Sequence, residues 1–417
     1  MIKMASKPGS SFGCYVISIT LVHLFIIASI VSLGTCQSVL NESSTSDDDD
    51  DTPKAFFIFG DSTVDAGNNN YIDTVPDNKA NYKPYGQNGY FQEPTGRFSE
   101  GRVIVDFIGE YAELPLIPAF LQPDADYSNG VNFASGGAGV LPETNQAMVI
   151  DLPTQLSHFE EVRESLSEKL GEKKAKELIS EAVYFISIGS NDYMGGYLGS
   201  PKMQQSYNPE QYVGMVIGNL TQAIQVLYER GARNFGFLSL SPLGCLPALR
   251  ALNSESNEGG CLEAASALAQ AHNHALSGVL KSLQEILEGF KYSNSNFYDW
   301  LQDRINNPTN YGFKDGMNAC CGSGPYRGVF TCGGMKEVKD YKLCENVDDY
   351  VWWDSFHPTE KIHHQFAKAL WNGPQTLVGP YNLHRLFAKT KVLRDLTIAD
   401  LVDTTNSGVP LVDTSEL

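Results

Sequence analysis

The segment Ala55-Phe56-Phe57-Ile58-Phe59 is followed directly by Gly60-Asp61-Ser62-Thr63. A continuous apolar run that ends at a glycine is typical of a parallel strand buried on both faces. Active sites of such sheets gather at the carboxyl ends of the strands. Ser62 is therefore predicted to lie at that edge of a sheet.

The rest of the chain alternates between further strands and helices, which predicts the α/β class with a mostly parallel five-stranded sheet. Four more strands are expected, at residues 130–134, 182–188, 234–240 and 297–299. Helices are expected at residues 102–112, 154–170, 209–230, 262–289 and 359–371. Residues 306–349 are rich in cysteine, glycine and asparagine and are expected to be irregular.

The segment Trp353-Asp354-Ser355-Phe356-His357-Pro358 holds a carboxylate three residues before a histidine. Such a carboxylate can orient the imidazole within one turn, and the imidazole can then act as the base for a serine. Ser62, Asp354 and His357 are therefore the candidate nucleophile, orienting acid and base. A second interpretation makes Asp354 a helix cap. Four competing histidines are predicted to be surface or packing residues: His272, His274, His363 and His364. His158 and His384 have no carboxylate at a matching offset.

Two glycine-bearing turns follow predicted strands and offer donors for an oxyanion. Gly136-Gly137 follows the strand at 130–134, and Gly189-Ser190-Asn191 follows the strand at 182–188. The candidate donors are the backbone N–H groups of Ser62 and Gly137 and the side-chain amide of Asn191. Taken singly, Gly137 and Asn191 are also explained as turn residues.

The two ends of the chain differ in composition from its centre. Residues 1–36 resemble a signal peptide, with Lys3 and Lys7, an apolar stretch and the small residues Gly34-Thr35 before Cys36. A retained membrane anchor is the competing interpretation. Residues 37–53 are an acidic linker expected to be disordered, residues 54–387 form the predicted domain, and residues 388–417 are a polar acidic tail.

The net charge of −19 disfavours nucleic-acid binding through a basic surface. Two of the eight cysteines, Cys14 and Cys36, fall in the predicted signal peptide. Six remain in the mature region: Cys245, Cys261, Cys320, Cys321, Cys332 and Cys344. An even number behind a signal peptide predicts three disulfides, and the spacing disfavours zinc. Sequons at Asn41 and Asn219 predict glycosylation and agree with secretion.

Several of these segments together resemble the plant-type secreted GDSL esterases/lipases of the SGNH hydrolase superfamily. The matching residues are 57–70, 95–99, 131–139, 188–192 and 354–359, with Ala319-Cys320-Cys321-Gly322-Ser323-Gly324 and residues 343–346 in the cysteine-rich part. The resemblance spans about residues 54–387 and implies a flavodoxin-like three-layer fold. It implies the nucleophile Ser62, the donors Gly137 and Asn191, and the pair Asp354 and His357. Thr63 departs from the family's leucine, at a position that follows the nucleophile.

The predicted function is hydrolysis of carboxylic esters by a serine esterase or lipase, through an acyl-enzyme and without a cofactor. Transfer of the acyl group to an alcohol by the same residues is the alternative, and a non-catalytic secreted binding or defence protein is a remote one. The expected partners are a small-molecule or lipid ester and, for transfer, an alcohol acceptor. The protein is predicted to be extracellular, with the vacuole as the alternative, and not inserted in a membrane once the signal is cleaved.

Overall fold

The computed structural model describes residues 54–253, 259–336 and 338–388. The predicted signal peptide, the acidic linker, the tail beyond Ala388 and the sequon at Asn41 lie outside these residues. The main sheet has the strand order β10-β5-β4-β3-β1-β2. Its strands are β1 (Phe56–Gly60), β2 (Gly130–Asn132), β3 (Val183–Ser187), β4 (Asn234–Phe237), β5 (Lys291–Ser295) and β10 (Val378–Pro380).

The first five strands are parallel, as the sequence predicts, and their order 2-1-3-4-5 is the flavodoxin-like order. A sixth strand, β10, was not predicted and pairs antiparallel with β5. The strand predicted at 297–299 is wrong, because these residues begin helix α9, where the Asn296 side chain accepts a hydrogen bond from the Asp299 N–H. The fifth strand is Lys291–Ser295, whose polar sequence gives no apolar run.

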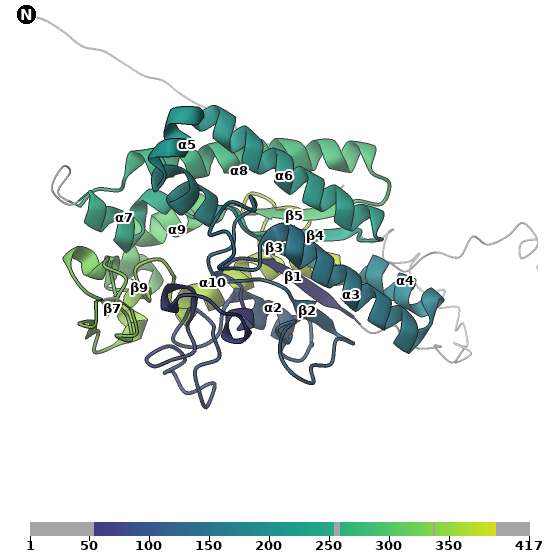
Figure 1. Cartoon of the computed structure of the whole chain (residues 1–417), viewed down its shortest axis with the longest axis horizontal. Helices are drawn as coiled ribbons and strands as arrows, with labels where there is room; N and C mark the ends of the chain where they lie inside the picture. The colour runs from purple at the N-terminus through teal and green to yellow at the C-terminus, as the bar shows by residue number, and fades with distance from the viewer. Residues whose placement is uncertain (1–53, 254–258, 337, 389–417) are drawn as a thin grey trace, which may run out of the picture. The chain divides into compact units, whose positions relative to one another are not determined.

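Helices cover both faces of the sheet, so the described domain has three layers (Figure 1). On one face lie α3 (Leu152–Leu170), α6 (Pro209–Glu229) and α8 (Glu263–Ile286), and on the other lie α2 (Ile104–Tyr111), α10 (Glu360–Asn372) and α11 (Leu383–Phe387). The other helices are α4 (Glu172–Glu181), α5 (Pro201–Ser206), α7 (Pro247–Leu252) and α9 (Phe297–Asn306). Among the described helices, none is long and apolar enough to cross a membrane.

Strand β1 shows why this sheet is buried on both sides. The ring of Phe57 packs on Phe159 of α3, whereas the ring of Phe56 packs on Phe387 of α11. All five residues of β1 are buried. Successive side chains point to opposite faces, so the continuous apolar run fills both layers at once.

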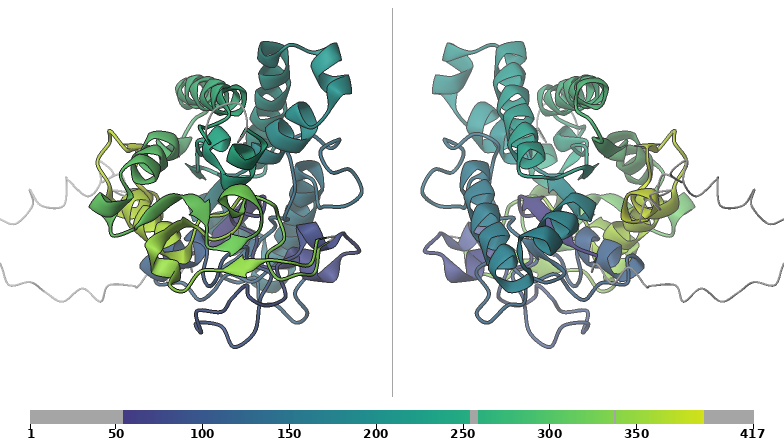
Figure 2. Two further views of the ribbon diagram at one scale, coloured as in Figure 1. Left: turned by 90° about the vertical axis from the view of Figure 1, so that its left-hand side faces the viewer. Right: turned by 90° about the vertical axis from the view of Figure 1, so that its right-hand side faces the viewer.

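The cysteine-rich region predicted at 306–349 forms, together with the residues that follow it, two small sheets beside the main one. β6 (Asp315–Ala319) pairs with β9 (Tyr350–Trp352), and β7 (Cys321–Gly322) pairs with β8 (Lys342–Leu343). These light green strands face the viewer in the left panel of Figure 2. The prediction of three disulfides is confirmed: Cys245–Cys261, Cys320–Cys344 and Cys321–Cys332.

Candidate active site

Ser62 lies just beyond the carboxyl end of β1, on a turn that the neighbouring strand and helix hold firmly. The Asp61 N–H donates to the Ser187 carbonyl oxygen of β3, over 3.0 Å. The Gln155 side chain from α3 bonds both the N–H and the carbonyl of Gly60, each over 2.9 Å. Gly60 has φ +156°, and a Cβ there would lie 2.2 Å from the Ser187 oxygen. The close approach of the two strands therefore requires glycine before Asp61-Ser62.

His357 and Asp354 reach Ser62 from the far end of the sequence. The Ser62 Oγ lies 2.7 Å from His357 Nε2, and His357 Nδ1 lies 2.8 Å from Asp354 Oδ1. Asp354 Oδ1 also accepts the N–H groups of Phe356 and His357. Helix α10 starts at Glu360 after Thr359, so Asp354 does not cap it, and the helix-cap interpretation is wrong.

Asp354 is fully buried and accepts a further hydrogen bond from the Tyr85 hydroxyl, over 2.8 Å. Burial by itself would raise the pKa of Asp354. The charge of His357 and the hydrogen bonds from His357, Phe356 and Tyr85 outweigh burial and hold this pKa below its ordinary value. The carboxylate is therefore ionised at neutral pH and can stabilise a positive imidazole.

The other two predicted positions, Gly137 and Asn191, line the same cavity as Ser62 and His357. Gly137 has φ +87°, and a Cβ there would lie 2.7 Å from Asn78 Oδ1, so the position requires glycine. Asn191 Nδ2 donates one hydrogen bond to the Ala138 carbonyl, over 2.9 Å. A side-chain amide carries two hydrogens, so this group can also donate into the cavity.

Asp192, which the sequence analysis did not single out, joins the two loops that carry Gly137 and Asn191. Its carboxylate accepts the N–H groups of Val140 and Leu141 and the hydroxyl of Thr144, over 2.7, 3.0 and 2.7 Å. Burial raises the pKa of Asp192 to about 6. The nearby Asp61 is also buried, which raises its pKa to about 6. Asp192 directly follows the predicted Asn191, and that adjacency was the available signal.

The cavity over Ser62 has a volume of about 360 Å³ and is lined by both polar and apolar side chains. Polar residues, Asp77, Asn78 and Asn145, lie on the chain segments near Gly137. The apolar lining residues are Phe98, Met194, Leu243, Leu246, Phe297, Phe330, Trp352 and Phe356. A site of this size and lining can hold a small or medium-sized ester.

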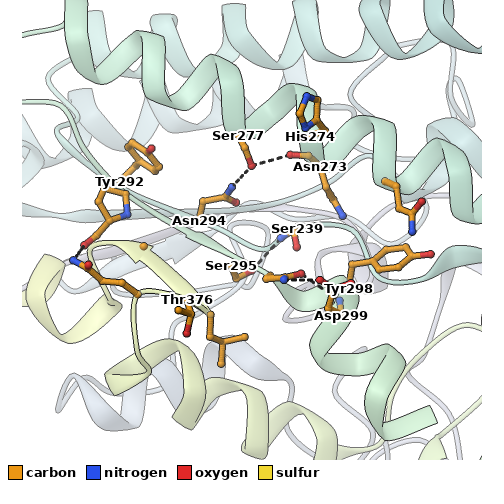
Figure 3. A pocket seen from close by; sticks show the side chains of 16 residues that line it. Ser239, Asn273, His274, Ser277, Tyr292, Asn294, Ser295, Tyr298, Asp299 and Thr376 are labelled. Carbon is orange, nitrogen blue, oxygen red and sulfur yellow. Dashed lines mark hydrogen bonds between the residues drawn. The ribbon is translucent and has the colours of Figure 1, made fainter. Parts of the chain in front are cut away.

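A second cavity, of about 690 Å³, lies beside α8, β5 and β10 (Figure 3). None of the predicted site residues lines it. Its polar side chains bond largely to one another or to the backbone. Asn294 donates to Ser277, over 2.9 Å, and Asn273 bonds both the N–H and the carbonyl of Leu240. The groups able to act on an ester are therefore gathered in the smaller cavity.

Two of the other histidines are buried in the fold, and a third packs on an aromatic ring. His272 is buried against the Tyr193 hydroxyl, 2.9 Å from Nδ1, and burial lowers its pKa to about 3. His363 is buried on α10, where burial likewise lowers the pKa to about 3. The ring of His364 stacks on Phe107. In the described part of the chain, no three His, Cys, Asp or Glu side chains are grouped so that they could hold a metal ion.

Comparison with known proteins gives the family. The model of the GDSL-like lipase/acylhydrolase family matches residues 56–370. The chain is 46% identical to GDSL esterase/lipase 5 of Arabidopsis thaliana over 393 residues, covering 93% of this chain and 98% of that protein. The chain belongs to the GDSL lipase/acylhydrolase family.

Two further relatives agree with this assignment. GDSL esterase/lipase 1 of Arabidopsis thaliana is 45% identical over 375 residues, which are 89% of this chain and 98% of that protein. The GDSL lipase of Tanacetum cinerariifolium is 44% identical over 333 residues, 80% of this chain and 87% of that protein. As a member of the GDSL family, the chain is an enzyme of the carboxylic ester hydrolase class, and its substrates are small-molecule esters.

Proposed function

We propose that this GDSL enzyme cleaves carboxylic esters through Ser62, His357 and Asp354, with an acyl-enzyme intermediate. The observation that carries the proposal is the continuous hydrogen-bonded path from Ser62 Oγ through both ring nitrogens of His357 to Asp354. Ser62 and His357 line the cavity, while Asp354 is buried behind them. This is the arrangement that a serine nucleophile needs near neutral pH.

The first step forms the bond from Ser62 Oγ to the ester carbonyl carbon. His357 Nε2 takes the hydroxyl proton, and the carbonyl oxygen becomes an oxyanion. The N–H groups of Ser62 and Gly137 and the Asn191 amide donate to this oxyanion. The carbon–oxygen bond of the leaving alcohol then breaks, and His357 returns the proton to that oxygen.

The second step releases the acyl group from Ser62. Water gives its proton to His357 and attacks the acyl carbon, which restores the Ser62 hydroxyl and yields a carboxylic acid. An alcohol can replace water in the same step and yield a new ester. The choice between hydrolysis and transfer therefore depends on which acceptor the cavity binds.

The proposal includes export to an oxidising compartment outside the cytosol. The three disulfides support it, because such bonds persist in extracellular and other oxidising environments. Asn219 lies exposed on α6, where an attached glycan meets solvent. We expect plant cells that express the tagged chain to secrete it. We also expect the secreted protein to carry the added mass of a glycan, which the Asn219→Gln variant lacks.

The test of the mechanism is turnover of p-nitrophenyl esters by the wild type and by Ser62→Ala, with and without an added alcohol. We expect Ser62→Ala to lower kcat by roughly 10⁴-fold or more with an unchanged circular dichroism spectrum. Ser157→Ala, at an exposed position on α3 that does not line this cavity, is the matched control and should stay near wild-type activity. A Ser62→Ala variant that folds and keeps its activity would contradict the mechanism. Formation of the new ester faster than free acid would assign transfer.

A further inference from the structure

Lys336 is a buried lysine that the proposed mechanism does not use. It lies in the cysteine-rich segment, and 3% of its surface is exposed. A lysine is seldom buried unless its charge is paired. Its ammonium donates to the Tyr82 hydroxyl over 2.9 Å and lies 3.4 Å from the centre of the Phe330 ring. The rings of Tyr82 and Tyr85 are 5.7 and 6.0 Å away, so three aromatic rings surround the charge.

Phe330 connects Lys336 to the catalytic cavity. Its ring lines that cavity and lies 5.1 Å from the ring of Phe356 and 6.3 Å from the ring of His357. A cation at 3.4 Å from a ring centre attracts the ring strongly where water is excluded. The ammonium therefore holds one wall of the cavity from behind.

The backbone around Lys336 is pressed against the loop that carries Tyr82. A Cβ at Gly333 would lie 2.6 Å from the Tyr82 ring, and Gly333 has φ +85°. The disulfide Cys321–Cys332 fixes the same segment just before this glycine. Phe330 thus lies just before Cys332 and Lys336 on one short stretch of chain, which the disulfide and the buried lysine both anchor.

We propose that Lys336 is a positioning residue that holds Phe330 in the wall of the catalytic cavity and thereby limits the size of the ester that the enzyme accepts. This proposal rests on the proposed function, because it concerns the cavity over Ser62. In this proposal Lys336 affects which esters are accepted and takes no part in the chemical steps. The lysine acts through Phe330.

The charge of Lys336 also gives the proposal a pH dependence. Burial lowers the pKa of Lys336 to about 8, although Asp354 and Asp77 oppose the shift. The titratable groups around the ammonium are Tyr82, Tyr85 and the carboxylates of Asp77 and Asp354. Above pH 8 the amine becomes neutral, and its attraction to the Phe330 ring is lost. Size selection should therefore relax in alkaline solution.

The experiment compares kcat/KM for p-nitrophenyl octanoate and p-nitrophenyl acetate at pH 7 and pH 9. The ratio of the two values cancels the steps that Ser62 and His357 perform on both esters. Ser62→Ala serves as the blank for spontaneous hydrolysis. If that variant is itself active, the proposed mechanism fails, and this outcome is separate from any change in the ratio.

We expect Phe330→Ala to raise the octanoate-to-acetate ratio roughly tenfold at both pH values, because the cavity loses a wall. Lys336→Met should also raise this ratio at pH 7. The ratio of the double variant should be only slightly higher than that of Phe330→Ala, because both substitutions act on the same wall. The wild-type ratio should rise from pH 7 to pH 9. Lys336→Arg should keep the low ratio at both, because a guanidinium stays charged.

The proposal is overturned if Lys336→Met keeps the wild-type ratio while Phe330→Ala changes it, or if Phe330→Ala changes nothing. If the Lys336→Met variant fails to fold, judged by circular dichroism, the proposal is tested by the ratio at pH 7 and pH 9 in the wild type and in Lys336→Arg. In that case a wild-type ratio equal at pH 7 and pH 9 contradicts the proposal. A ratio that rises in wild type and not in Lys336→Arg supports it.

Discussion

The candidate site is made by two regions that are stabilised in different ways. Ser62, Gly137 and Asn191 follow β1, β2 and β3 of the main sheet, whose strands are covered by helices on both faces. Asp354 and His357 follow β9, in a region of short strands where two disulfides lie close together. The first, which we call the sheet-borne region, is held by buried apolar layers and strand pairing. The second, which we call the cross-linked region, has short strands and relies more on disulfide bonds.

The difference separates the groups proposed to perform the chemistry from the wall proposed to limit the size of the ester. Positions fixed by neighbouring parallel strands move little, because each strand is bonded along its length. A loop held by one disulfide and one buried lysine can change with few substitutions. The proposed nucleophile and oxyanion donors therefore belong to the first region, and the wall at Phe330 belongs to the second.

After Ser62→Ala, the largest effect on activity is expected from a substitution of Asn191, in the sheet-borne region. Asn191→Ala removes one amide donor from the developing oxyanion and should lower kcat by about 10²–10³-fold, with KM little changed. Steady-state kinetics on p-nitrophenyl acetate measure both constants. Asn219→Ala is the comparison variant and should stay near wild-type activity, because Asn219 is an exposed amide on α6 that does not line this cavity. Full activity of Asn191→Ala would remove Asn191 from the proposed oxyanion site.

The second prediction concerns removal of a disulfide from the cross-linked region. Replacing both Cys321 and Cys332 by serine opens an 11-residue separation and should lower the free energy of unfolding by about 2–4 kcal/mol. Urea unfolding followed by circular dichroism gives the value. The same substitutions should raise the octanoate-to-acetate ratio, because Phe330 is then less constrained. An unfolding midpoint equal to that of the wild type would show that this disulfide does not stabilise the region.

Much of the sheet-borne region could be predicted from the sequence. The apolar run of β1 and the glycine turns after β1, β2 and β3 mark strands and their carboxyl ends by local pattern alone. Strand β5 was not predicted, because its sequence, Lys291-Tyr292-Ser293-Asn294-Ser295, has no apolar run. Its place is set by pairing with β4 and β10, which is a tertiary effect.

In the cross-linked region, spacing predicted the pair Asp354 and His357 but not their surroundings. Tyr85 reaches Asp354 across 269 positions of sequence, and Lys336 reaches Tyr82 across 254. Neither contact has a local signal, because only the folded chain brings the segments together. The cysteine count predicted three disulfides, whereas their pairing depended on the same long-range geometry.

The smallest expected effect concerns Glu100, which lies where the two regions meet. Its Oε1 accepts the N–H of Glu360, at the start of α10 just after His357, over 2.9 Å. Burial raises the pKa of Glu100 to about 8, well above its ordinary value of 4.5. The folded protein therefore binds a proton at pH 7 that the unfolded chain has released. Stability from this group is full below about pH 4.5 and is lost as pH rises through 8.

Between pH 6.5 and 7.5 the titration of Glu100 alone should accordingly lower the free energy of unfolding by about 1 kcal/mol. The buried His272 and His363 act in the opposite direction in the wild type and in Glu100→Gln alike, because their pKa values of about 3 lie below the ordinary value. The buried Asp61, Asp65 and Asp192 have pKa values of about 6, so most of the stability that their protonation contributes is already lost below pH 6.5. Glu100→Gln keeps the shape without the titration, and its stability should change less across this interval. Thermal melts of both proteins at matched pH values measure the difference. Equal slopes would mean that Glu100 is already ionised in the folded protein, and the two regions would then meet at a buried negative charge.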